Sequence, residues 1–277
     1  MMPAITRTVP ALTVLLTAIT AAAPLAAQVD EQLWRWVNSQ GSVCVWYLAD
    51  PAVAPGLVPE GVTLRPATAT ASLPESMLRI VQDEPRFADW IPGMLCIGRF
   101  AVVAADGNPV GEMREGQSHL LVLSALAAAS PFGQDAGWQL ASIGLRAGRL
   151  DQVAEVARIG SESAQFRTRV GVEGEDDEWE LSFDGLKLIW RGHPTGQPRV
   201  GTTQTMSFGY AGERNTAWLV ALRSNPETEQ GQVGSFRVEG KNPLAQALKS
   251  SPIRSMGPVS GGGELTLTFR RLGPDGG

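Results

Sequence analysis

Few residues of this sequence have the types and spacing that catalysis or metal binding requires. Only two histidines occur, His119 and His193, and neither has a cysteine or carboxylate at the short intervals of a zinc site. The sequence contains no phosphate-binding loop, dinucleotide fingerprint, HExxH or GxSxG motif. These absences argue against nucleotide-dependent enzymes, zinc proteases and α/β-hydrolases. We therefore expect neither a metal nor a cofactor.

The two cysteines of the chain, Cys44 and Cys96, both lie in apolar segments. In an exported protein such a pair is most simply one disulfide. The alternative is two buried free thiols. A catalytic thiol is disfavoured, because neither cysteine has a histidine or a basic cluster nearby in the sequence that would lower its pKa.

The first 27 residues have the layout of a secretory signal peptide. Arg7 precedes an apolar run from Val9 to Ala23, and small residues follow up to a cleavage position after Ala27. The run is shorter than the roughly 20 apolar residues of a membrane-spanning helix, although an uncleaved membrane anchor is the alternative. We expect a periplasmic or secreted protein in which residues 28–277 form a single domain. It would meet a membrane only if the N-terminal segment is retained.

The composition fits a folded domain and excludes a nucleic-acid partner. Of 277 residues, 43% are hydrophobic and 18% are charged, and the formal net charge is −5. Without a cationic surplus the chain has little capacity to neutralise phosphates. The 31 glycines and 19 prolines indicate many turns, which favours a β-dominated fold.

Period-two alternation of apolar and polar residues predicts several half-buried strands in the second half of the chain. It runs over 164–170, 179–183, 206–210, 236–238 and 265–269. An antiparallel sheet of such strands protects its edges by curling into a sandwich or a barrel.

The remaining segments complete a mainly β fold with a few short helices. Asp184-Gly185 predicts a hairpin turn, and Pro243–Leu248 predicts a short helix. We interpret Asp30–Val37 as one or two helical turns. Leu120–Ala129 is apolar on all sides, so it is either a buried helix or a central strand, and its periodicity does not decide between them.

Three stretches resemble, in the same order, the acetoacetate decarboxylase family. Val45–Leu64 (VWYLADPAVAPGLVPEGVTL) is similar to the family's strand, Asp-capped helix and Leu/Val-Pro-Glu segment. Leu186–Val200 (LKLIWRGHPTGQPRV) is similar to its Leu-Lys-x-Ile stretch and Gly-x-Pro-Arg turn. Gly234–Leu267 resembles a strand, a short Pro-Leu helix, a Leu-Pro-Val step and a final strand. Together the three stretches frame most of the chain after residue 27.

The resemblance implies a closed or cone-like antiparallel β-barrel with an internal apolar pocket. In that family the activity rests on a Schiff-base lysine in a Gly-Arg-Glu … Pro-Lys-Lys motif. The matching place here is Gly133–Leu140 (GQDAGWQL), where Asp135 stands for the glutamate while the arginine and both lysines are missing. The lysines of the chain, Lys187, Lys241 and Lys249, lie outside this motif.

The sequence therefore predicts an exported, non-catalytic acetoacetate-decarboxylase-like protein. It would bind a small apolar or weakly polar organic molecule in a barrel pocket, whose candidate residues are Asp135, Trp138, Trp190 and Phe208. One alternative is a structural or accessory subunit that docks onto a larger envelope membrane complex. Another is an enzyme that uses carboxylate or histidine acid–base chemistry in the same cavity. Whether the protein is an enzyme stays open, with the missing lysines favouring a binding role.

Overall fold

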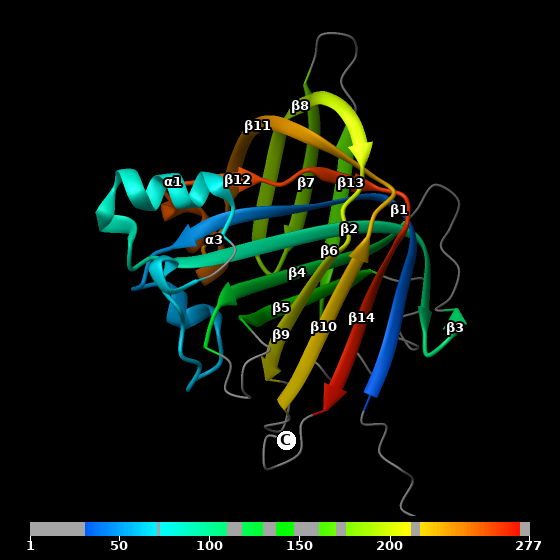
Figure 1. Cartoon of the computed structure of the whole chain (residues 1–277), viewed down its shortest axis with the longest axis horizontal. Coiled ribbons are helices and arrows are strands. Elements are labelled where there is room, and N and C mark those ends of the chain that lie inside the picture. Colours follow the sequence, from blue (N-terminus) through cyan, green and yellow to red (C-terminus); the bar gives the residue numbers. More distant parts are fainter. Residues whose placement is uncertain are drawn as a thin grey trace, which may run out of the picture.

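The fold is built almost entirely from β-strands (Figure 1). The computed structural model describes residues 31–70, 73–109, 118–129, 137–146, 161–169, 176–211 and 217–271. The strands are β1 (Glu31–Ala49), β2 (Ile91–Ala105), β3 (Asn108–Pro109), β4 (His119–Ala127), β5 (Trp138–Arg146), β6 (Ser161–Arg169), β7 (Asp177–Phe183), β8 (Leu186–Val200), β9 (Gln204–Ala211), β10 (Ala217–Asn225), β11 (Thr228–Glu239), β12 (Arg254–Met256), β13 (Val259–Gly261) and β14 (Glu264–Arg271). The described helices are α1 (Glu75–Asp83), α3 (Pro243–Ser250) and three 3-10 helices at Ala54–Leu57, Ala67–Ala69 and Pro85–Phe87. The prediction of a mainly β protein with a few short helices is confirmed.

The strand pairings return on themselves in two closed circuits that share four strands. The first ring runs β1–β2–β4–β5–β9–β10–β14 and returns to β1. The second ring runs β1–β2–β4–β5–β6–β7–β8–β11–β13 and also returns to β1. Most pairs are antiparallel as expected, whereas β5 pairs in parallel with both β6 and β9.

The shared strands form a wall with a hydrophobic core on each face. All nine residues of β4 are buried. Leu121 and Leu123 belong to the core of the first ring, while Leu120 and Val122 belong to the core of the second. Leu120–Ala129 therefore contains a central strand, and it lacks alternation because both faces of the strand are covered.

The second ring is packed on its own aromatic and aliphatic core. Trp179 stacks on Trp190 with 6.0 Å between ring centroids, and Leu244 and Leu248 of α3 contribute to the same cluster. A third, smaller cluster lies beneath α1, around Met77. The shared wall therefore separates the core of the second ring from the core of the first.

The predicted hairpin turn at Asp184-Gly185 and the predicted short helix at Pro243–Leu248 are both confirmed. Asp184 and Gly185 connect β7 to β8 with φ angles of 47° and 67°, the left-handed conformation of a two-residue hairpin turn. Helix α3 begins at Pro243, as predicted, because the Asn242 side chain accepts a hydrogen bond of 2.8 Å from the backbone N–H of Ala245.

The interpretation of Asp30–Val37 as helical turns is wrong. Residues 31–37 belong to β1 and pair with β14. Trp34 and Trp36 are buried whereas Leu33 and Arg35 are exposed, so this segment alternates with the period of a strand. Two tryptophans on one face of an extended strand both reach the core of the first ring, which a helix would not allow.

Residues 1–30 lie outside the described residues, so cleavage after Ala27 stays a prediction. In the part of the chain that the structure describes, no helix is long and apolar enough to cross a membrane.

Candidate functional site

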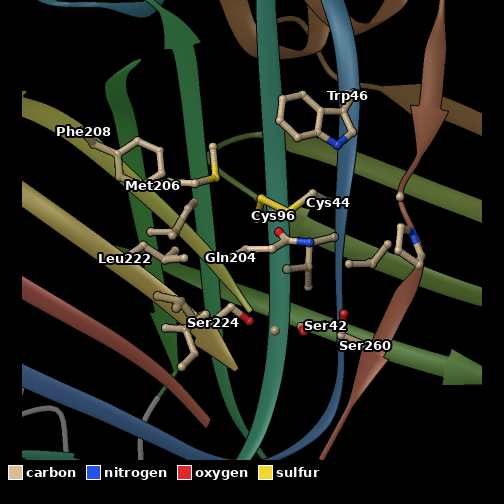
Figure 2. Close-up of a pocket in the computed structure, with 18 residues that line it drawn as sticks. Ser42, Cys44, Trp46, Cys96, Gln204, Met206, Phe208, Leu222, Ser224 and Ser260 are labelled. Carbon is tan, nitrogen blue, oxygen red and sulfur yellow. A yellow bond between two sulfur atoms is a disulfide. The ribbon is translucent and has the colours of Figure 1, made fainter. Parts of the chain in front are cut away.

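A cavity of about 140 Å³ lies inside the first ring (Figure 2). Strands β1, β2, β4, β9, β10, β13 and β14 contribute to its wall, together with Gly257 and Pro258 in the connection from β12 to β13. Because the wall is a set of paired strands, the inward side chains are held at fixed positions.

The wall is mostly apolar and carries a few neutral polar groups. Its apolar and sulfur-containing residues are Val43, Cys44, Trp46, Cys96, Ile97, Leu121, Leu123, Met206, Phe208, Leu222, Pro258 and Leu265. Its polar side chains are Ser42, Gln204, Ser224 and Ser260. Among the described residues that line the cavity, none is Asp, Glu, Lys, Arg or His. The wall therefore suits an uncharged ligand best.

The polar groups lie at one end of the cavity, because each of three strands has a polar residue at that end and apolar residues further along its inward face. Strand β1 presents Ser42, Cys44 and Trp46 in succession along its inward face, and β9 likewise presents Gln204, Met206 and Phe208. Antiparallel pairing sets Ser224 opposite Gln204 and Leu222 opposite Met206. Figure 2 shows Ser42, Ser224 and Ser260 gathered away from Trp46 and Phe208.

The two cysteines form part of the cavity wall. Cys44 and Cys96 face each other across the β1–β2 pair with 2.04 Å between their Sγ atoms, which is disulfide distance. The pairing expected from the cysteine count is therefore the one that the fold brings together. Such a bond is compatible with an oxidising location outside the cytoplasm.

The residues named as pocket candidates from the sequence lie in different places. Phe208 lines the cavity, and Trp138 packs edge-on against the cavity residue Trp46 with ring centroids 5.6 Å apart. Trp190 lies in the core of the second ring, on the far side of the shared wall. Asp135 lies outside the described residues.

The polar residues of the cavity were not identified from the sequence. The signal available was a break in the apolar alternation: Gln204 precedes Met206 and Phe208 on the same face, and Ser42 precedes Cys44 and Trp46. A serine or glutamine at a strand end also fits an ordinary exposed position, so this signal alone does not distinguish a pocket from a surface.

The three lysines lie away from the cavity wall. The Lys187 Nζ atom pairs with the Glu180 carboxylate at 2.9 Å, and 39% of its side chain is exposed. Lys249 donates from Nζ to the backbone carbonyl of Gly240 at 2.6 Å, and Lys241 is exposed. None of the three lysines is among the residues that line the cavity.

The histidines and carboxylates do not gather into a metal site in the described ranges. His119 is buried in β4, whereas His193 is exposed and its Nδ1 atom lies 3.0 Å from Asp176. No group of three or more His, Cys, Asp or Glu residues that could hold a metal ion occurs among the described residues.

Comparison with solved structures finds several of similar architecture at low identity. Acetoacetate decarboxylase from Legionella pneumophila is 11% identical, with 87% of each chain covered and a TM-score of 0.47. Another acetoacetate decarboxylase structure is 9% identical, with 86% of each chain covered and a TM-score of 0.44. The enduracididine biosynthesis enzyme MppR, complexed with pyruvate, is 12% identical over 86% of this chain and 87% of its own, with a TM-score of 0.43.

Two of these structures are acetoacetate decarboxylases, and a further similar structure is an acetoacetate-decarboxylase-like enzyme from Sphingomonas wittichii. They come from the family that the three sequence stretches resemble. No protein-family model matches the sequence, and no curated protein matches it.

Proposed function

We propose that this protein is an exported, non-catalytic binding protein that holds a small uncharged organic molecule in the cavity of the first ring. In this proposal the first ring is a closed, acetoacetate-decarboxylase-like barrel around the ligand. The observation that carries the proposal is the cavity itself, about 140 Å³ in volume with a described lining that is neutral throughout. A dry apolar cavity of about 150 Å³ is known to bind benzene, so the ligand is of similar size.

The positions of the lysines support a role without Schiff-base chemistry. Such chemistry needs a neutral amine in a dry pocket beside the substrate carbonyl. The Lys187 amine is instead paired with Glu180 at the surface, Lys241 precedes α3, and Lys249 lies in the last turn of α3. Acid–base catalysis in the cavity has no support either, because its described lining contains no carboxylate or imidazole.

Export is supported by the cysteine pair and by the N-terminal sequence. Disulfides persist in oxidising compartments, and Cys44 and Cys96 are paired across β1 and β2. N-terminal sequencing of the exported protein is expected to begin near Gln28. An intact Met1 chain held in membranes would contradict export and favour the accessory-subunit role.

Docking onto an envelope complex is less well supported than ligand binding. A docking face is usually a contiguous apolar patch. Among the residues that the structure describes, the large hydrophobic side chains that are exposed lie on five different elements, at Leu33, Leu78, Val102, Val200 and Val233. No specific arrangement of these residues favours a protein partner, so we propose the cavity as the functional site.

Binding of benzene, followed by isothermal titration calorimetry, tests the proposed function. Leu222→Trp is expected to abolish binding, because Leu222 lines the cavity and the indole would occupy it. The matched control is Leu219→Trp on the same strand, at a position outside the cavity lining. Saturable binding that Leu222→Trp removes and Leu219→Trp retains supports the proposal. Absence of saturable binding to the wild-type protein overturns it.

A further inference from the structure

We infer that the ligand is an uncharged amphipathic alcohol, bound with its hydrocarbon end deep in the cavity and its hydroxyl at the serine-rich end. The inference rests on the proposed function and adds the chemical class and orientation of the ligand. It starts from the four polar side chains of the wall, Ser42, Gln204, Ser224 and Ser260.

These side chains form two cross-strand pairs. Ser42 and Ser260 are register partners in β1 and β13, while Gln204 and Ser224 are register partners in β9 and β10. Partners in a sheet point to the same face, with Cβ atoms about 5 Å apart. The two pairs therefore concentrate neutral hydrogen-bonding groups at one end of the cavity.

The polar groups are not used by the described part of the protein. Neither the three serine hydroxyls nor the Gln204 carboxamide takes part in a side-chain hydrogen bond there, whereas other serines do; the Ser251 hydroxyl, for example, accepts from the backbone N–H of Leu48 at 2.9 Å. The three half-buried serines and the exposed Gln204, without a protein partner for their side chains, remain available to a ligand or to water.

The exposure of the wall sets the direction of binding. Gln204, at the start of β9, is exposed and Ser224 is half-buried, whereas Phe208, in the middle of β9, is 1% exposed. The polar end is thus the end nearest to solvent. A ligand that enters with its hydrocarbon part first buries that part against Phe208 and leaves its polar group among the serines.

The chemistry of the four groups selects a hydroxyl over an ion. Serine and glutamine side chains both donate and accept hydrogen bonds, which matches an alcohol that does the same. A carboxylate would lose hydration without gaining a cationic partner, because no Lys, Arg or His occurs in the described lining. The cavity is therefore expected to discriminate against the acid that corresponds to a bound alcohol.

Calorimetric titrations with toluene, benzyl alcohol and benzoate test this inference, because the three probes share one ring. The double variant Ser42→Ala/Ser224→Ala is expected to weaken benzyl alcohol binding about five- to tenfold, the value of one or two neutral hydrogen bonds, and to leave toluene binding unchanged. Gln204→Ala is a second variant. Because Gln204 is exposed, this replacement is expected to leave folding intact. Ser207→Ala is the control, since Ser207 lies on the other face of β9.

The outcomes separate this inference from the proposed function. If toluene binds but the double variant weakens both probes equally or neither, the cavity is a binding site and the alcohol is not held by these serines. Benzoate binding as tight as that of benzyl alcohol would also overturn the inference. If neither toluene nor benzyl alcohol binds the wild-type protein, the proposed function fails and the inference falls with it.

Discussion

Tyr47 lies directly opposite Gly93 in the β1–β2 pair, and its phenol ring covers the place where a side chain at position 93 would lie. A Cβ atom at Gly93 would be 2.6 Å from Cε2 of Tyr47 and 2.8 Å from its oxygen. Tyr47 is fully buried in the core of the second ring. Glycine at position 93 is therefore a packing requirement of the wall that both rings share.

Gly93→Ala is expected to destabilise the protein by about 1–3 kcal/mol, because overpacking forces the ring or the strand to move. Urea denaturation measures the change. Gly137→Ala is the control, since a Cβ there meets no atom within 4 Å. Equal stability of the Gly93→Ala variant and the wild type would show that the Tyr47 ring packs elsewhere.

Burial of Tyr47 predicts a specific sensitivity to alkaline pH. Burial raises the pKa of the Tyr47 phenol well above its ordinary value, an effect that the neighbouring Ser124 hydroxyl partly offsets. A raised pKa means that the folded state favours the neutral phenol. The contribution of this neutral phenol to the free energy of unfolding is complete below the tyrosine pKa of about 10 in the unfolded chain. It is lost progressively as the pH rises above that value.

The measurement is the stability difference between wild type and Tyr47→Phe at several pH values. The difference should be constant at neutral pH and should shift in favour of the phenylalanine variant above about pH 10. Lysines and other groups common to both proteins cancel in this comparison. A difference that stays constant up to pH 11 would mean that Tyr47 ionises as readily in the folded protein as in the unfolded one.

The fold was predictable from the sequence where only one face of a strand is covered. Trp179, Leu181 and Phe183 alternate with polar residues and are all buried, as predicted from the pattern. In β4 both faces are covered, so the alternation that separates strand from helix is missing. Both faces of β4 are covered because the cores of two rings pack against it, and the strands of these rings are far apart in the sequence.

The candidate site was predictable in part for the same reason. The alternation over 206–210 and 265–269 predicts that Phe208 and Leu267 lie on the apolar faces of their strands, and both are buried in the core of the first ring. Trp190 shows an equally apolar pattern, yet it lies in the second ring. Periodicity tells which residues point inward and does not tell into which of two enclosed spaces they point.

The cysteine pair gives a prediction about covalent state. Alkylation of the denatured, unreduced protein is expected to label neither Cys44 nor Cys96, because the two cysteines are register partners in β1 and β2 and are joined as a disulfide. Reduction should destabilise the protein by about 2–4 kcal/mol, because the disulfide closes a loop between residues that are 52 positions apart. Labelling of two thiols per chain by mass spectrometry would show that the pair is reduced in the purified protein.

Incubation with acetylacetone followed by borohydride reduction tests the absence of Schiff-base chemistry. An imine forms only from a neutral amine, and a lysine reaches that state near pH 7 only when burial or a nearby cation lowers its pKa by several units. The Lys187 amine is instead paired with the Glu180 carboxylate, and 39% of its side chain is exposed. Lys249 is exposed and donates to the Gly240 carbonyl, and Lys241 is exposed as well. We therefore expect no covalent adduct by intact-mass measurement at pH 7. Lys187→Ala provides the discriminating control, because an adduct that appears on the wild type and disappears in this variant would restore a lysine-based enzyme and contradict the non-catalytic role.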